Sequence, residues 1–112
     1  MQASAKSKYI RISPYKLRPY ADVVRGLSLD KACSWLKTCE NRRTEPLLKT
    51  ILSAYANAKN VNAEINSLES MMIKEIKVDQ GPIIKYFKPG AMGRANVQRK
   101  RLCHLLVTVA KK

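Results

Sequence analysis

The C-terminal part of this chain carries positive charge that no acidic residue balances. Residues 83–112 contain eight lysine or arginine side chains and no aspartate or glutamate. Within this stretch, residues 88–94 form a turn-like segment with glycine and proline between two strand-like runs, which predicts a β-hairpin. The hairpin, over about residues 83–101, has too few apolar side chains to be buried. We therefore expect it to project from the folded body or to stay mobile until it binds a partner.

The composition of the whole chain points to a single basic domain. The 112 residues include 22 basic and 8 acidic side chains, which gives a formal net charge of +14, and 46% of the residues are hydrophobic. This length and hydrophobicity predict one globular domain over residues 1–112. Such a surplus of positive charge opposes compaction of the chain unless an anionic partner absorbs it. Nucleic acid is the polyanion that this charge pattern favours.

Three segments have apolar residues at three- and four-residue steps, which is typical of helices that pack one face against a core. They span about residues 14–25, 29–39 and 45–60. Each segment follows a hydroxyl side chain that is suited to cap the start of a helix. These expected caps are Ser13, Ser28 and Thr44.

The remaining segments predict strands, because polar and apolar residues alternate along them. In chain order they are a short strand at 8–12, a polar connection at 61–69, a strand from 70 with a bend at 79–82 that resumes at 83–87, and a return strand at 96–110. From residue 102 to 110 the return strand is apolar on both faces, so we expect it to lie centrally and to be covered by helices. The predicted architecture is α+β, with three helices packed on a small antiparallel sheet and two strands extended into a long protruding β-hairpin.

The residues that catalysis or metal binding would need are few and scattered. Cys33, Cys39 and Cys103 have no zinc-ligand spacing, and we expect them to be reduced and mostly buried. His104, the single histidine, follows Cys103 in a strand, where neighbours point to opposite faces and cannot form a nucleophile–base pair. No catalytic or nucleotide-binding motif, apolar signal segment or membrane-spanning run is present. The sequence predicts no enzyme activity, no cofactor, no metal site and no membrane partner.

Basic residues gather at two places where RNA contacts are expected. In an extended strand Arg99 and Arg101 share one face while Lys100 takes the other, so the hairpin can meet phosphates on both sides. A second group of cations surrounds the start of the first helix, whose free N–H groups can bind a phosphate. The expected contacts are Lys85, Lys88, Arg94, Arg99, Lys100 and Arg101 on the hairpin, and Lys8, Arg11, Lys16 and Arg18 near the helix.

Three aromatic side chains stand near these basic groups. They are Tyr15, Tyr86 and Phe87. Each of them can stack on an RNA base, since unpaired bases are commonly bound on aromatic rings. Packing in the core or within the hairpin explains the same side chains equally well, so both interpretations stay open.

Four motifs, in order along the chain, resemble one known family. They are IRISPYK at 10–16 with VRG at 24–26, SAYANA at 53–58, GRA at 93–95, and KRLCH at 100–104. Together they resemble the large-subunit ribosomal protein twenty-two family in its bacterial or organellar form. The resemblance covers nearly the whole chain.

This resemblance implies a body on the outside of the large ribosomal subunit and a hairpin that threads into ribosomal RNA. The implied partners are large-subunit rRNA, neighbouring large-subunit ribosomal proteins and, at the hairpin tip, the nascent peptide in the exit tunnel. The implied location is a cytoplasmic or an organellar ribosome. The RNA contacts implied by the family motifs are Ser13, Lys16, Arg94, Lys100, Arg101 and His104. The implied tunnel tip is Pro89, Gly90, Ala91, Met92, Gly93 and Arg94.

The chain departs from the family pattern at a few positions. Gly90 and Met92 stand where the family often has a basic residue, so the tip is less charged here. Cys103 replaces a frequent small hydroxyl residue. A different function also fits the composition, namely a non-ribosomal architectural protein that inserts its ribbon into a DNA groove. A preference for duplex DNA over folded ribosomal RNA would favour that alternative.

Overall fold

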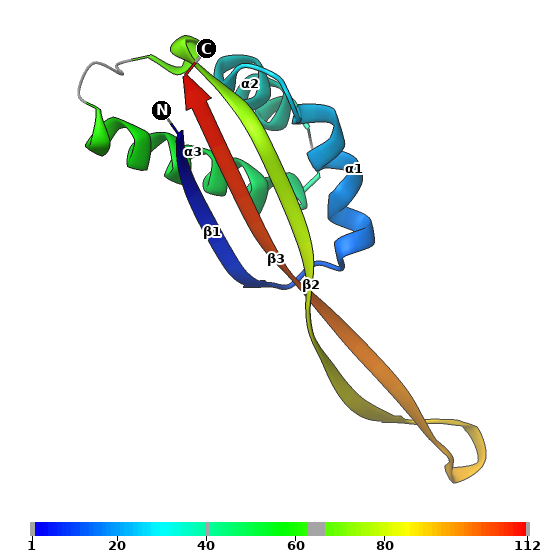
Figure 1. Ribbon diagram of the computed structural model, residues 1–112. Coiled ribbons are helices and arrows are strands. Elements are labelled where there is room, and N and C mark those ends of the chain that lie inside the picture. The colour runs from blue at the N-terminus through cyan, green and yellow to red at the C-terminus, as the bar shows by residue number, and fades with distance from the viewer. Residues whose placement is uncertain (1, 40, 63–66, 112) are drawn as a thin grey trace.

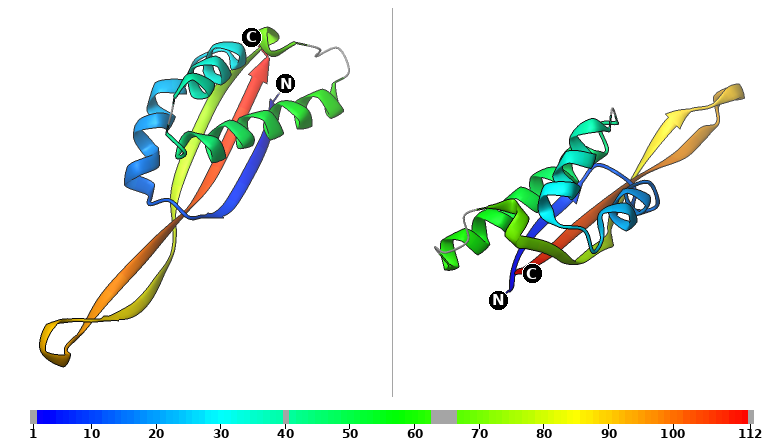
Figure 2. Two further views of the ribbon diagram at one scale, coloured as in Figure 1. Left: turned by 180° about the vertical axis from the view of Figure 1, so that it is seen from behind. Right: turned by 90° about the horizontal axis from the view of Figure 1, so that it is seen from above.

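The protein consists of two layers, with helices on one face of an antiparallel sheet (Figures 1 and 2). The computed structural model describes residues 2–39, 41–62 and 67–111. The middle of the connection expected at 61–69 and the last C-terminal lysine lie outside these residues. The described elements are β1 (Gln2–Ile10), α1 (Pro14–Val24), α2 (Leu29–Thr38), α3 (Thr44–Val61), β2 (Met71–Pro89) and β3 (Ala95–Lys111), with 3-10 turns at Leu68–Ser70 and Ala91–Gly93. The predicted α+β class is confirmed.

Strand β3 lies in the middle of the sheet, between β1 and β2, as its apolar sequence predicts. β2 and β3 stay paired as far as Pro89 and Ala95, whereas the pairing of β1 ends opposite Cys103. Beyond that point the sheet has two strands, and these form the long arm in Figure 1. The arm explains why the molecule measures 65 Å in one direction and only 26 and 16 Å in the others. The protruding hairpin is therefore confirmed.

The bend predicted at residues 79–82 is the place where the arm leaves the body. The pairing of β2 with β3 shifts between Gln80 and Ile83, which is the signature of a β-bulge. Gly81 lies inside this bulge against the backbone of Leu102. A Cβ atom at Gly81 would come within 3.1 Å of the Leu102 carbonyl carbon, so a side chain there would push the two strands apart.

The core lies between the helices and one face of the sheet. Alternate residues of β3, among them Leu105, Val107 and Val109, point into it and are fully buried. On the opposite face Leu106 is only half-buried, because no helix covers that side (Figure 2). The expectation that helices would cover the return strand is thus correct for one face and wrong for the other. The helix residues with no exposed surface are Leu17, Ala21, Val24, Leu29, Ala32, Leu47, Ile51, Ala54 and Ala58.

Strand β1 begins well before the predicted strand at residues 8–12. Its inward-facing residues are small, namely Ala3, Ala5 and Ser7, and they pack under α3. The Ser7 hydroxyl lies 2.7 Å from the hydroxyl of Thr50 on α3, where it forms a hydrogen bond. Small side chains give almost no hydrophobic alternation, which is why the sequence pattern did not reveal this part of the strand.

Two of the three predicted helix caps are in place, but neither acts through its side chain. Ser13 and Ser28 precede α1 and α2 in an extended conformation, and neither hydroxyl accepts a bond from the helix start. Thr44 is the first residue of α3 instead of its cap. Its Oγ1 donates to the carbonyl of Asn41 at 2.8 Å, so it closes the loop between α2 and α3.

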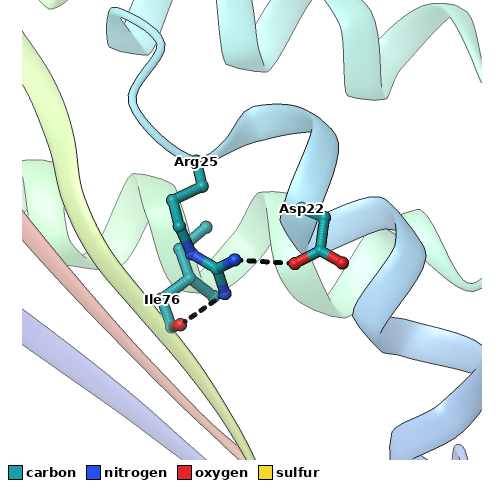
Figure 3. A network of polar contacts seen from close by, with 3 residues as sticks. All are labelled: Asp22, Arg25 and Ile76. Atoms are coloured by element: carbon teal, nitrogen blue, oxygen red, sulfur yellow. Dashed lines mark hydrogen bonds and ion pairs between the residues drawn. The ribbon is translucent and has the colours of Figure 1, made fainter.

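The outer edge of β2 is covered by α1 and by the loop that follows it. Arg25 donates from Nη2 to the Ile76 carbonyl at 2.9 Å and from Nη1 to the Asp22 carboxylate at 2.6 Å (Figure 3). Arg18 donates to the Val78 carbonyl at 3.1 Å. The loop between α1 and α2 adds main-chain bonds to the start of β2. These contacts occupy carbonyl groups that another strand would otherwise pair with.

We expect the arm to exchange its amide hydrogens much faster than the body. Residues 83–101 of the two strands are exposed, whereas residues 102–109 of β3 are buried or half-buried in the body. Backbone hydrogen bonds without a packed core above them open easily. Hydrogen-exchange mass spectrometry of the free protein should show rapid labelling of the arm and slow labelling of the body. Equal protection of both parts would contradict this expectation.

Candidate nucleic-acid interface

A basic hollow of about 770 Å³ lies where the arm joins the body. Three segments that are distant in sequence meet there: the turn between β1 and α1, the loop between α2 and α3, and the base of the arm on β3. The described residues that line it are Arg11, Ile12, Ser13, Lys16, Arg42, Arg43, Val97, Arg99, Lys100 and Arg101. Seven of these ten side chains are cations, so the hollow is suited to a polyanion.

The hollow joins two groups of residues that the sequence suggested as separate contact sites. Arg11, Ser13 and Lys16 come from the region around the first helix, while Arg99 and Arg101 come from the hairpin. The fold brings them together because β1 pairs with the body end of β3, immediately before the arm begins. One continuous surface therefore holds six of the twelve predicted contacts.

The turn between β1 and α1 is fixed by an irregular end of the strand. Tyr9 has a left-handed backbone, with φ of 59°, and lies in a register shift between β1 and β3. The Ile12 amide then donates to the carbonyl of Ile10 at 2.8 Å, and both isoleucines pack partly against the core. This anchoring directs Arg11 toward the hollow. The Lys16 amide donates to the Ser13 carbonyl, so the start of α1 offers fewer free N–H groups than the sequence suggested.

Arg42 and Arg43 line the hollow but were not among the residues predicted to contact RNA. Asn41 holds their loop in place: its Oδ1 accepts a bond from the Arg43 amide at 3.0 Å, and its Nδ2 donates to the Tyr20 hydroxyl at 2.7 Å. Two adjacent arginines in a short loop between helices are a signal that could have been used. Their proximity to the arm, however, depends on tertiary packing and is not visible in the sequence.

The cations of the hollow have no carboxylate partners among the described residues. The ion pairs that the described residues form are Arg25–Asp22, Lys49–Glu45 and Lys77–Glu75, all on exposed surfaces. None of them involves a side chain that lines the hollow. The hollow is thus a concentration of positive charge that the described part of the protein does not neutralise.

Lys8, Arg18 and His104 lie outside the hollow. Lys8 borders a second hollow of about 410 Å³, which shares Arg11 and Arg42 with the first. Arg18 donates to a carbonyl of β2, so part of its guanidinium is already engaged in the fold. His104 Nδ1 accepts a bond from the Tyr9 amide at 3.1 Å, which leaves Nε2 as its second hydrogen-bonding atom. Their contact with RNA stays a prediction.

The other predicted contacts lie along the arm toward its tip. Lys85 is paired with Arg99 across the strands, and Lys88 is paired with Asn96. The tip is tighter than the predicted turn, because the strands continue to Pro89 and resume at Ala95. Lys88 is consequently part of the strand and not of the turn.

A short 3-10 segment and two left-handed residues close the tip. Met92 has φ of 58° and its side chain is 98% exposed, and Gly93 follows with φ of 73°. Gly90 and Arg94 face each other, because the Gly90 amide bonds to the Arg94 carbonyl. A Cβ atom at Gly90 would lie 2.8 Å from Asn96 Nδ2 and 2.9 Å from the Arg94 carbonyl oxygen, so a side chain there would force this tip to shift.

Two of the three cysteines are buried, and their thiols are not activated by their surroundings. Burial raises the pKa of the Cys33 and Cys103 thiols, which disfavours the reactive thiolate form. No group of three or more His, Cys, Asp or Glu side chains comes together to hold a metal ion in the described part of the chain. The described helices also include none that is both long and apolar enough to span a bilayer.

Known proteins resemble this chain over almost its full length. The model of the family described as ribosomal protein L22p/L17e matches residues 5–110. The large ribosomal subunit protein uL22 of Desulfitobacterium hafniense (strain Y51) is 43% identical over 111 residues, which cover 99% of this chain and 96% of the relative. The uL22c protein of Chlorokybus atmophyticus is 44% identical over 109 residues (97% and 90%), and uL22 of Chloroflexus aggregans is 42% identical over 112 residues (100% and 97%).

Proposed function

Because this chain belongs to the ribosomal protein L22p/L17e family and is a structural protein of the large ribosomal subunit, we propose that it binds large-subunit rRNA through its basic hollow and its arm. The observation that carries this proposal is the convergence of seven cations from three separate segments, none with a carboxylate partner among the described residues. Phosphates of folded RNA supply the missing counter-charge, and the release of bound cations from the RNA contributes to the affinity.

The arm adds a second kind of contact, because its two faces carry different side chains. The register places Arg99 and Arg101 opposite Lys85 and Ile83 on one face, while Lys100 lies on the other. An arm with cations on both faces fits between two RNA segments that both approach it. The protein then organises the RNA by neutralising segments that would otherwise repel each other.

The tip of the arm, residues 89–94, is proposed to line the nascent-peptide exit tunnel. Its central residues, from Gly90 to Gly93, carry no charge, and the Met92 side chain is almost completely exposed. Such a tip reaches past the cationic part of the arm and presents a neutral surface to a passing peptide. The body of the protein would then face neighbouring proteins of the large subunit, in a cytoplasmic or organellar ribosome.

The family assignment favours this function over an architectural protein that inserts its ribbon into a DNA groove. A ribbon that binds DNA lies in the groove of a regular duplex, which lacks the irregular shape of folded RNA. The hollow is instead formed at a concave junction between the arm and the body. A concave cationic junction suits the converging backbones of a compact RNA better than one uniform duplex.

Binding to large-subunit rRNA should weaken steeply as salt is added. If all seven cations of the hollow contact phosphates, the slope of log affinity against log salt should be about −5 to −6, at about −0.7 to −0.9 per phosphate. Fluorescence anisotropy with a large-subunit RNA fragment, at salt concentrations of about 50 to 200 mM, measures this slope. Affinity that does not change with salt would refute the electrostatic mechanism, and tighter binding to duplex DNA in the same assay would favour the alternative function.

The double variant Arg42→Ala/Arg43→Ala should reduce the magnitude of the salt slope by about 1.4 to 1.8, because two phosphate contacts are lost. The double variant Lys31→Ala/Lys37→Ala on α2 removes the same charge away from the hollow and serves as the matched control. It should leave the slope nearly unchanged. Circular dichroism should confirm that both variants fold. Equal effects of the two variants would mean that the hollow is not the RNA site.

A photo-crosslinking amino acid at position 92 should label nascent peptides in translating ribosomes that contain the protein. We expect this labelling because the Met92 side chain is exposed at the end of the arm. The same crosslinker at Lys31, on the outside of the body, should label no nascent peptide. Labelling from position 31 but not from position 92 would place the tip away from the tunnel.

A further inference from the structure

Four aromatic side chains are strongly exposed in the described part of the protein. They are Tyr9, Tyr15, Tyr86 and Phe87. Exposing a large apolar ring to water costs free energy, so the contacts of each ring indicate whether it is covered by the protein itself. The contacts of the four rings separate them into two classes.

The three tyrosine rings already have partners within the protein. The His104 ring lies edge-on against Tyr9 at 5.0 Å between ring centres. Arg18 lies over the ring of Tyr15 at 5.4 Å, and Lys88 lies over the ring of Tyr86 at 5.7 Å. Phe87, which is 70% exposed, has no ring or cation contact of this kind with any described residue.

The neighbours of Phe87 on the arm are cationic and apolar. Phe87 pairs with Val97 and Lys85 pairs with Arg99, and alternate residues of a strand share one face. These four side chains therefore lie together on one face of the arm. Val97 and Arg99 also line the basic hollow, so Phe87 extends the same surface from the hollow toward the tip.

An uncovered ring beside two cations that form no ion pair with the described residues matches the chemistry of a nucleotide. A nucleobase stacks on an aromatic face, and its flanking phosphates take the charge of lysine and arginine. The arm does not neutralise these cations itself, since residues 80–111 contain no acidic side chain, and for the same reason the arm of a second copy could not do so. The charge complementarity favours RNA as the occupant.

We propose that Phe87 is a stacking platform for one unpaired base of large-subunit RNA, with Lys85 and Arg99 binding the phosphates beside it. The proposal rests on the proposed function, because it requires RNA on this face of the arm. It also adds a selectivity that charge alone does not give. A base can stack on Phe87 only when it is free of its own helix, so this site recognises a bulge, a loop or a flipped nucleotide instead of uniform duplex.

The variant Phe87→Leu tests the site, because it keeps an apolar side chain and removes the ring. Affinity for a large-subunit RNA fragment should fall about 5- to 100-fold, with little change in the salt slope. Phe87→Trp should retain the affinity. The matched control is Tyr86→Leu, the neighbouring residue on the opposite face, whose ring is already covered by Lys88, and it should have a much smaller effect.

Ultraviolet crosslinking of the wild-type protein bound to the same RNA gives an independent readout. Mass spectrometry should find a nucleotide attached to Phe87. Wild-type affinity of the Phe87→Leu variant, or equal losses in the Phe87→Leu and Tyr86→Leu variants, would overturn the stacking proposal while leaving the proposed function intact. Absence of salt-dependent RNA binding by the wild-type protein would overturn the proposed function itself, and the stacking site with it.

Discussion

The pairing of β2 with β3 is the interaction on which the rest of the structure depends. The same two strands form two of the three strands of the sheet and, further out, the entire arm. In the body this pairing is fixed by buried side chains such as Leu105 and Val107, whose burial sets the register. Beyond the bulge at Gly81 no core supports it, so the arm inherits its register and its direction from the body. The place of every cation along the arm follows from that register.

The net charge of +14 produces electrostatic repulsion within the free protein, and few ion pairs of the described residues offset it. The ion pairs of the described residues are exposed and contribute little to stability. Folding therefore relies on the core between the helices and the sheet, while hydrogen bonds such as those of Asn41 hold the arginine loop in place at the hollow. In the proposed function, the phosphates of bound RNA relieve this repulsion. The core stabilises the fold, whereas the proposed function resides in the hollow and the arm.

Local patterns in the sequence were sufficient to predict the helices, the hairpin and the central position of β3. The pattern failed where side chains are small, as for Ala3 and Ala5 in β1, because such residues leave no hydrophobic alternation. It also failed to reveal the hollow, since Arg42 joins the arm only through the packing of α2 and α3 on the sheet. For Arg18 the charge suggested a contact with RNA, but the sequence did not reveal that its guanidinium also bonds to a carbonyl group of β2.

The covered edge of β2 affects how copies of the free protein can associate before they join a ribosomal subunit. Exposed sheet edges allow copies of a chain to join side by side into aggregates. Here Arg18 and Arg25 block one edge by binding its carbonyl groups, and the other edge strand carries Lys6 and Lys8, which repel a second copy. In the proposed function, these two protected edges keep copies of the body apart before the protein binds RNA.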